Sequence, residues 1–219
     1  MELSTLLTNP VYIFTMTAFV VLQFAAAGLQ FWTISYMQVV LGVDPVKAQS
    51  TFVVALFSAM LPGVMLGATL SDYYGGYKGK GMANSLTLCV ILGAFSTLFA
   101  FLLSRAFDYE SFTALTWLFF FAGAGIMPIA QGIIVGCVPK FASNSANALY
   151  GICVNIFALT VAPILAGDVM EQYKSKREGM IEGYKILLFT PPVFVCLFMI
   201  ARAIASRFLK SMETEPINI

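Results

Sequence analysis

Long apolar runs alternate with short polar segments along the whole chain. Six runs contain about 18 or more uncharged residues, enough for an α-helix to cross the hydrocarbon core of a bilayer. They span roughly residues 11–41, 48–70, 83–103, 112–138, 146–167 and 184–201. The longest polar connection, at about 168–183, contains EQYKSKREGMIE. The pattern predicts an all-α membrane protein with six transmembrane helices, a six-helix bundle over residues 11–205.

The two ends of the chain are more polar than the middle. We interpret residues 1–10 as an N-terminal segment or the end of an inter-domain linker, and residues 206–219 as a polar C-terminal tail. An even number of spans places both termini on one side of the membrane. The 12 lysine and arginine residues divide equally between the two sides, so the positive-inside rule does not choose the orientation.

The six runs also form two triplets, and the longest run comes first in each. An odd number of crossings reverses the direction of a second copy in the membrane, so two sets of three spans are what an inverted repeat requires. We therefore expect a 3+3 inverted repeat.

Composition removes several function classes. Apolar residues make up 59% of the chain and charged residues 11%, against about 25% charged residues in an ordinary soluble domain. The absence of histidine excludes His-ligated metal or haem sites and Ser-His hydrolysis. A net charge of +1 without a long basic run predicts no nucleic-acid partner. We expect no enzyme activity, no cofactor and no bound metal.

The four cysteines lie inside apolar runs, far apart and without C-x-x-C spacing. This distribution favours buried thiols over disulfides or metal ligands. They are Cys89, Cys137, Cys153 and Cys196.

Small residues and proline indicate where helices meet or bend. Small residues four apart allow two membrane helices to approach closely, and a proline removes one backbone hydrogen bond, which predicts a kink at Pro128. Bent helices at the midplane are where transporters place their substrates, although an ordinary packed bundle uses the same residues. The candidate positions are Gly63, Gly123, Gly125, Pro128 and Gly167.

Polar side chains inside the spans are candidates for contact with a solute. Gln23 and Gln30 are seven residues apart, so they lie within about 20° of each other on a helix. Gln131 and Asn155 lie in the fourth and fifth runs, and Trp32 belongs either to an interfacial aromatic belt or to a cavity. Hydrogen bonding between helices explains the glutamines equally well. No Asp, Glu, Lys or Arg lies in the core of a span, so the spans offer no ionisable group for proton coupling.

The segment GATLSDYYGGYKGKG, residues 67–81, follows the second run and resembles the loop motif of the major facilitator superfamily, G-x-x-x-D-R/K-x-G-R/K-R/K. Tyr73 takes the place of the basic residue after the acid, and the lysines lie further downstream than in the pattern. The corresponding residues are Gly67, Asp72, Gly75, Lys78 and Lys80.

Residues 138–168 are similar to the eleventh-helix region of the same transporters. An A-x-A-L start at residues 146–149 precedes a Pro-x-x-x-Gly-Asp ending formed by Pro163, Gly167 and Asp168. Together the two matches resemble the C-terminal six-helix half of a major facilitator transporter, and spinster-like members are the closest likeness. The resemblance implies cytoplasmic termini and a central cavity lined by the first and fourth spans. It makes the following residues substrate-facing candidates: Gln23, Gln30, Trp32 and Gln131.

Three functions remain open at this point. In the first, the chain transports a small, amphipathic or lipid-like solute by alternating access, together with a second six-helix half. In the second, it is a non-catalytic structural subunit of a membrane complex, derived from a transporter half. An intramembrane enzyme is disfavoured, because the spans contain no acid–base pair. The expected partners are the lipid bilayer, a second half or other membrane subunits, and an undefined small solute.

Overall fold

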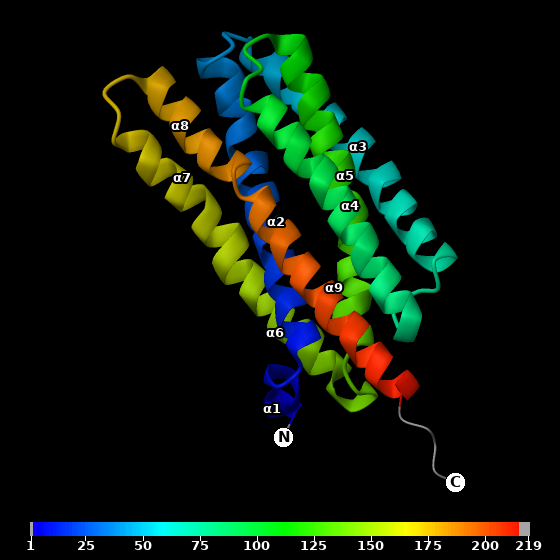
Figure 1. The fold of residues 1–219 in the computed structure, drawn as a ribbon. Helices are drawn as coiled ribbons and strands as arrows, with labels where there is room; N and C mark the ends of the chain where they lie inside the picture. Colours follow the sequence, from blue (N-terminus) through cyan, green and yellow to red (C-terminus); the bar gives the residue numbers. More distant parts are fainter. Residues whose placement is uncertain (1, 215–219) are drawn as a thin grey trace.

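The computed structural model describes residues 2–214 and, within them, the side chains of residues 3–208. All the regular elements in this part are helices (Figure 1). They are α1 (Glu2–Leu7), α2 (Pro10–Val39), α3 (Pro45–Tyr73), α4 (Gly79–Leu103), α5 (Tyr109–Gly136), the 3-10 helix η1 (Lys140–Ala142), α6 (Ser143–Cys153), the π-helix η2 (Val154–Thr160), α7 (Val161–Glu171), α8 (Lys176–Leu188) and α9 (Pro191–Thr214).

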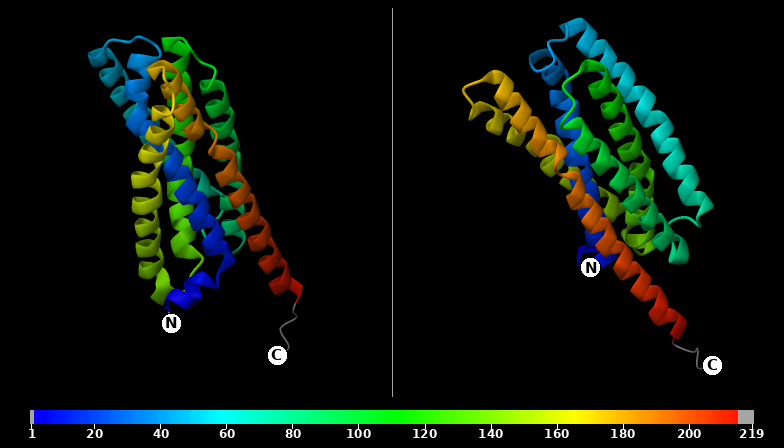
Figure 2. Two further views of the ribbon diagram at one scale, coloured as in Figure 1. Left: turned by 90° about the vertical axis from the view of Figure 1, so that its left-hand side faces the viewer. Right: turned by 45° about the horizontal axis from the view of Figure 1, so that its top comes forward.

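Six helical stretches are long and apolar enough to cross a membrane, which confirms the predicted number of spans. The first four are α2, α3, α4 and α5. The fifth span (Lys140–Glu171) joins η1, α6, η2 and α7, and the sixth (Lys176–Phe208) joins α8 to α9. The chain is therefore a multi-pass membrane protein. The N-terminus, the α3–α4 loop and the end of α9 lie at one end of the bundle, called here the terminal end (Figures 1 and 2).

The predicted polar connection at 168–183 is wrong in its extent. Helix α7 continues to Glu171 and α8 begins at Lys176, so only residues 172–175 form the turn. Lysine, arginine and glutamate are good helix formers, and the Ser175 hydroxyl accepts a hydrogen bond from the backbone N–H of Glu178, 3.4 Å away. Hydropathy marks where a helix is buried in lipid, whereas these helices extend beyond that region.

Side-chain caps begin three of the long helices. Asn9, Asp44 and Asp108 are the N-caps of α2, α3 and α5, and each side chain accepts backbone N–H bonds from the first turn. At α5 the donor is the N–H of Ser111, 2.8 Å from Oδ2 of Asp108. This hydrogen bond favours the charged carboxylate and lowers the pKa of Asp108. The last residue of each loop before α2, α3 and α5 thus caps the helix that follows it.

The first helix of each triplet packs against helices of the other triplet. Helix α5 packs mainly against α3 and α4, whereas α2 packs against η2 and α7 of the fifth span and against α8 and α9 of the sixth. Helices α4 and α9 lie side by side (Figures 1 and 2). The first helix of each triplet therefore contacts the second and third spans of the other triplet.

Burial differs greatly between the spans. In each span we compare the buried share of its own most hydrophobic 18-residue stretch. This share is 61% in α5 and 44% in α2, but only 22% in α3 and in the fifth span. Exposed apolar side chains of α3 include Val54, Phe57, Leu61 and Met65. In a membrane these faces contact lipid or another protein.

The expectation that all four thiols are buried is wrong for Cys196, which is exposed on α9, and only Cys89 is buried outright. An apolar run favours burial in water-soluble proteins, whereas in a membrane the same run can face lipid.

Candidate functional site

A small cavity lies between α2, α3 and α5, at the junction of the two hydrophobic cores of the bundle. Its volume is about 30 Å³, and Gln23, Gln30, Met60, Gly123 and Met127 contribute to its wall. Such a volume holds a water molecule or two, but solute sites typically need about 300–1,000 Å³. This cavity is therefore a mainly apolar recess lined by two glutamines, without room for a solute.

The cavity exists because the surrounding residues are small or adaptable. An added Cβ at Gly123 would approach only the Leu22 side chain, at 3.7 Å, and Ala26 and Ala124 complete the small-residue part of the wall. The two methionines can change rotamer at little cost. The structure thus places Gln23 and Gln30 together on one helix face, as their spacing predicts, and aligns them with Gly123 of the fourth span.

Trp32 does not line this cavity. Its indole Nε1 donates a hydrogen bond to the carbonyl oxygen of Pro163, 3.0 Å away, and its ring lies beside Gly167. Three residues singled out from the sequence therefore meet at one contact between α2 and α7. The indole N–H is therefore already hydrogen-bonded to another helix of the bundle.

Gln131 and Asn155 also lie outside the cavity. Gln131 is exposed, and its Nε2 donates to Oδ1 of Asn147 at 2.9 Å, which links α5 to α6. Asn155 is exposed on the π-helix η2 and donates to the carbonyl of Gly151, one turn earlier, at 2.8 Å. The five polar candidates thus occupy different sites: Gln23 and Gln30 share the cavity, and the other three are apart from it.

Glycines bring α3 and α5 into backbone contact. An added Cβ at Gly63 would meet the carbonyl of Phe121, and one at Gly67 would meet the carbonyl of Gly125. Helix α5 runs without interruption from Tyr109 to Gly136 with Pro128 inside it. The small residues of α3 therefore act at a contact with the fourth span.

The α3–α4 loop is held by backbone and hydroxyl groups. Gly75, Gly76 and Gly79 have positive φ angles of 99°, 73° and 52°, in the region that favours glycine. The Ser85 hydroxyl donates a hydrogen bond to the carbonyl oxygen of Gly76 at 2.8 Å. The hydroxyl oxygens of Ser71 and Ser85 also lie 2.8 Å apart. The loop conformation is therefore fixed by glycines and by two buried serines.

The loop also carries three charged side chains. Asp72, Lys78 and Lys80 are exposed. Among the described residues, no hydrogen bond or ion pair is made by the carboxylate of Asp72. The acid that matches the family's loop motif is thus exposed and takes no part in the serine hydrogen bonds that hold the loop.

Sequence reasoning missed Tyr77, which anchors this loop. Its ring lies across Gly132 of α5, and its backbone carbonyl lies close to Gly136. A glycine pair four residues apart near the end of a span is the signal that could have indicated this contact.

A cleft opens beside this anchored loop. Its volume is about 690 Å³, and its wall includes Lys78 of the loop, Gln131 and Val135 of α5, Lys140 of η1 and Ser143 of α6. By volume it is far larger than the cavity at Gln23 and Gln30.

Within residues 2–214, no three Cys, Asp or Glu side chains come together as a metal site. A search for related sequences finds no matching protein-family model and no matching curated protein.

Proposed function

We propose that this chain is one half of a major-facilitator-type transporter, which moves a small amphipathic solute by alternating access against a second six-helix half. The observation that carries the proposal is the reciprocal packing of the two triplets. Helix α5 packs on α3 and α4, and α2 packs on the fifth and sixth spans. Two copies related by a two-fold axis in the membrane plane would make the same contact twice in this way. The packing supports a 3+3 inverted repeat.

Uneven burial supports the need for a second half. Helix α3 and the fifth span bury only 22% of their most hydrophobic stretches, while α5 buries 61%. A second half placed against α3 and the fifth span would cover these faces. It would also complete a chamber in front of Gln23 and Gln30, whose present recess of about 30 Å³ is too small for a solute.

A structural role is the second candidate, and the hydrogen bonds of Trp32 and Gln131 favour it. Both side chains use their donors in contacts between helices, with Pro163 and Asn147 respectively. Polar residues that hold helices together are expected in any membrane bundle. In this case the chain would support an assembly without contacting a solute.

The test is uptake of a fluorescent lysophospholipid by proteoliposomes that contain the chain alone or together with a co-purified second half. We expect uptake only with the second half, and loss of uptake in the Gln23→Leu/Gln30→Leu double variant with assembly unchanged. Gln38→Leu is the matched control, because Gln38 lies on the same helix but outside the cavity.

Three outcomes would contradict the proposal. Uptake by the chain alone would remove the need for a second half. Full uptake by a correctly assembled Gln23→Leu/Gln30→Leu variant would show that the cavity glutamines do not face the solute, and a complex that assembles but never transports would favour the structural role.

A further inference from the structure

We propose that the cleft between the α3–α4 loop and the end of α5 binds an anionic membrane phospholipid, with the lipid phosphate between Lys78 and Lys140. This inference is independent of transport. It rests on the two cations, on the apolar part of the wall beside them, and on the charges of the described side chains at the terminal end.

The two lysines reach the cleft from different elements. Lys78 comes from the loop that Tyr77 anchors on α5, and Lys140 begins η1 after α5 has ended. Neither forms an ion pair in the part of the chain that the structure describes. Two unpaired ammonium groups at one opening favour a ligand with a negative charge, and the volume of about 690 Å³ lies within the range of small-molecule sites.

Beside the lysines and the polar Gln131 and Ser143, the wall has an apolar part along the end of the fourth span. Gly132, Val135 and Gly136 line the cleft along the last turns of α5, and Val135 is 38% exposed. At 1.5 Å per residue, Gln131 lies about 7 Å deeper than Gly136. A phosphate at the lysines would therefore place an acyl chain along α5, whereas a soluble anion would leave this wall uncovered.

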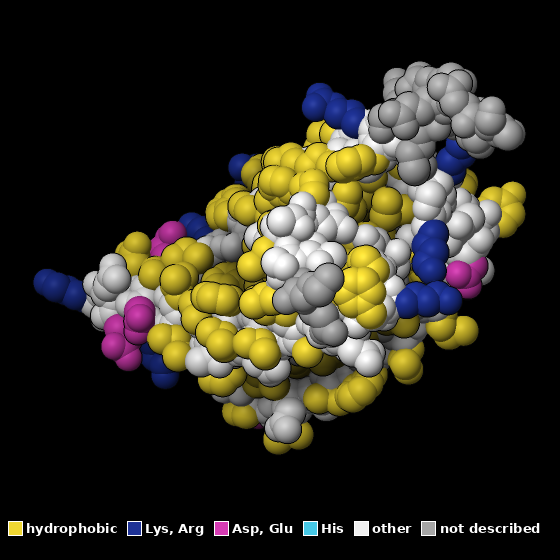
Figure 3. All heavy atoms as spheres, turned by 90° about the horizontal axis from the view of Figure 1, so that it is seen from below, with side chains coloured by type: hydrophobic (Ala, Val, Ile, Leu, Met, Phe, Trp, Pro, Cys, Tyr) yellow, Lys and Arg dark blue, Asp and Glu magenta, His cyan; other side chains and the backbone are white. Residues whose placement is uncertain are grey.

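Among the described side chains of the terminal end, basic groups predominate. Its described side chains comprise one carboxylate, Asp72, and the cations Lys78, Lys80, Lys140, Arg202 and Arg207. Figure 3 looks onto this end and shows several lysine and arginine side chains on the right of the view, with an acidic side chain beside them.

The far end of the bundle has the opposite balance. Its six cations, Lys47, Arg105, Lys174, Lys176, Arg177 and Lys185, are outnumbered by seven carboxylates, Asp44, Asp108, Glu110, Asp168, Glu171, Glu178 and Glu182. An anionic leaflet attracts basic groups at the membrane surface. Charge complementarity therefore assigns the lipid to the leaflet at the terminal end.

Binding is measured by native mass spectrometry on the full chain, delipidated in a neutral detergent and titrated with dioleoylphosphatidylglycerol. We expect the first lipid to bind K78Q/K140Q roughly 30-fold more weakly than the unchanged protein, since each lysine near a lipid surface contributes about 1 kcal/mol, a factor of about five. The control K174Q/K176Q removes two exposed charges at the far end and should leave this affinity unchanged. Circular dichroism checks that each variant is folded.

Three outcomes would overturn the proposal. The first is equal affinity of K78Q/K140Q and the unchanged protein, and the second is an equal loss in both double variants, which would indicate unspecific attraction. The third is competition by glycerol 3-phosphate at the same concentration as the lipid, which would identify a soluble phosphate ester as the ligand. Dioleoylphosphatidylcholine should bind more weakly than the anionic lipid. Because no transport is measured, a negative result leaves the transporter proposal untouched.

Discussion

Replacing Gly67 by alanine tests whether the backbones of α3 and α5 must touch. An added Cβ would meet the carbonyl oxygen, the carbonyl carbon and the Cα of Gly125, which are backbone atoms that cannot rotate away. The two helices would have to separate. Overpacking typically costs about 1–3 kcal/mol, and alanine regains about 1 kcal/mol of helix propensity. Because the obstacle is rigid, we expect a net loss of about 2 kcal/mol of unfolding free energy.

Alanine variants of two other glycines provide reference values for the loss of unfolding free energy expected at Gly67. Gly151 lies in α6 with nothing within 4 Å of an added Cβ, so Gly151→Ala should stabilise the protein by about 0.5–1 kcal/mol through helix propensity alone. At Gly132 the obstacle is the Tyr77 ring, a side chain that can move, so its alanine variant should fall between the other two. The series separates steric contact from the general effect of replacing glycine.

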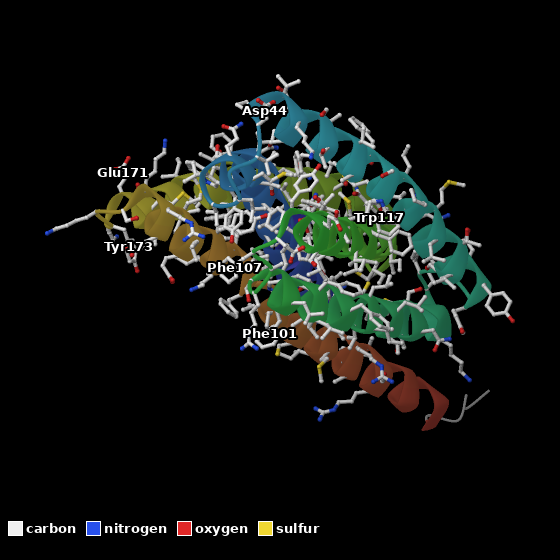
Figure 4. The ribbon with its side chains drawn as sticks, turned by 90° about the horizontal axis from the view of Figure 1, so that it is seen from above. Asp44, Phe101, Phe107, Trp117, Glu171 and Tyr173 are labelled. Carbon is white, nitrogen blue, oxygen red and sulfur yellow. The ribbon has the colours of Figure 1, made fainter. Side chains whose placement is uncertain are left out.

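Trp117 provides a local signal for the α3–α5 contact. Its Nε1 donates to Oγ of Ser58 on α3 at 3.0 Å, and its ring stacks on Phe121 with centroids 5.1 Å apart. Figure 4 looks onto the far end and shows Trp117 on α5, beside α3, well away from Glu171 and Tyr173 of the α7–α8 turn. Fluorescence in a Trp32→Phe background, followed during unfolding in mixed micelles, should show a shifted native spectrum for Gly67→Ala. An unchanged spectrum together with unchanged stability would refute the close contact, and so would an equal loss at Gly151.

Two further predictions concern buried polar groups. The hydroxyl oxygens of Thr33 and Tyr184 lie 2.8 Å apart in the interior. A double-mutant cycle with Thr33→Val and Tyr184→Phe should therefore give a coupling energy of about 0.6–1.7 kcal/mol. Additive effects of the two substitutions on stability would argue against this hydrogen bond. Cys137 is half-buried, and this burial raises the pKa of its thiol to about 12, which keeps the thiol protonated at pH 8 and lowers its thiolate fraction relative to a free thiol. Maleimide labelling of the folded chain at Cys137 should therefore be far slower than after unfolding in SDS, and equal rates would contradict the burial.

The six spans could be predicted because a bilayer imposes a single requirement, an uninterrupted apolar length. The ends of the spans could not, since helix formation continues where hydropathy falls. Lys176 to Glu182 are helical in α8 although they are polar, because their helix propensity and the Ser175 cap act independently of lipid. A separate search for caps and helix formers would have extended the sixth helix.

The candidate site was predictable only within single helices. Gln23 and Gln30 share a face through their spacing alone, and the structure places both on the same cavity. The partner of Trp32 depends on how α7 packs against α2, and no local pattern contains that information. Tyr77 lies in the loop that resembles a family motif, yet its role arises from Gly132, more than fifty positions later in the chain.

The glycine contacts also restrict how this half could move in the proposed transport cycle. Helices α3 and α5 meet through their backbones at Gly63 and Gly67. Tyr77 holds the α3–α4 loop on α5 at Gly132. Separating these parts would break backbone contacts at several positions together, so they should move as one body. The fifth span differs, because its π-helix (Val154–Thr160) has a wider turn than an α-helix, and π-helical segments often occur at functional sites. Bending during transport is therefore expected in the fifth span, and the contact of α3 with α5 should persist in every state.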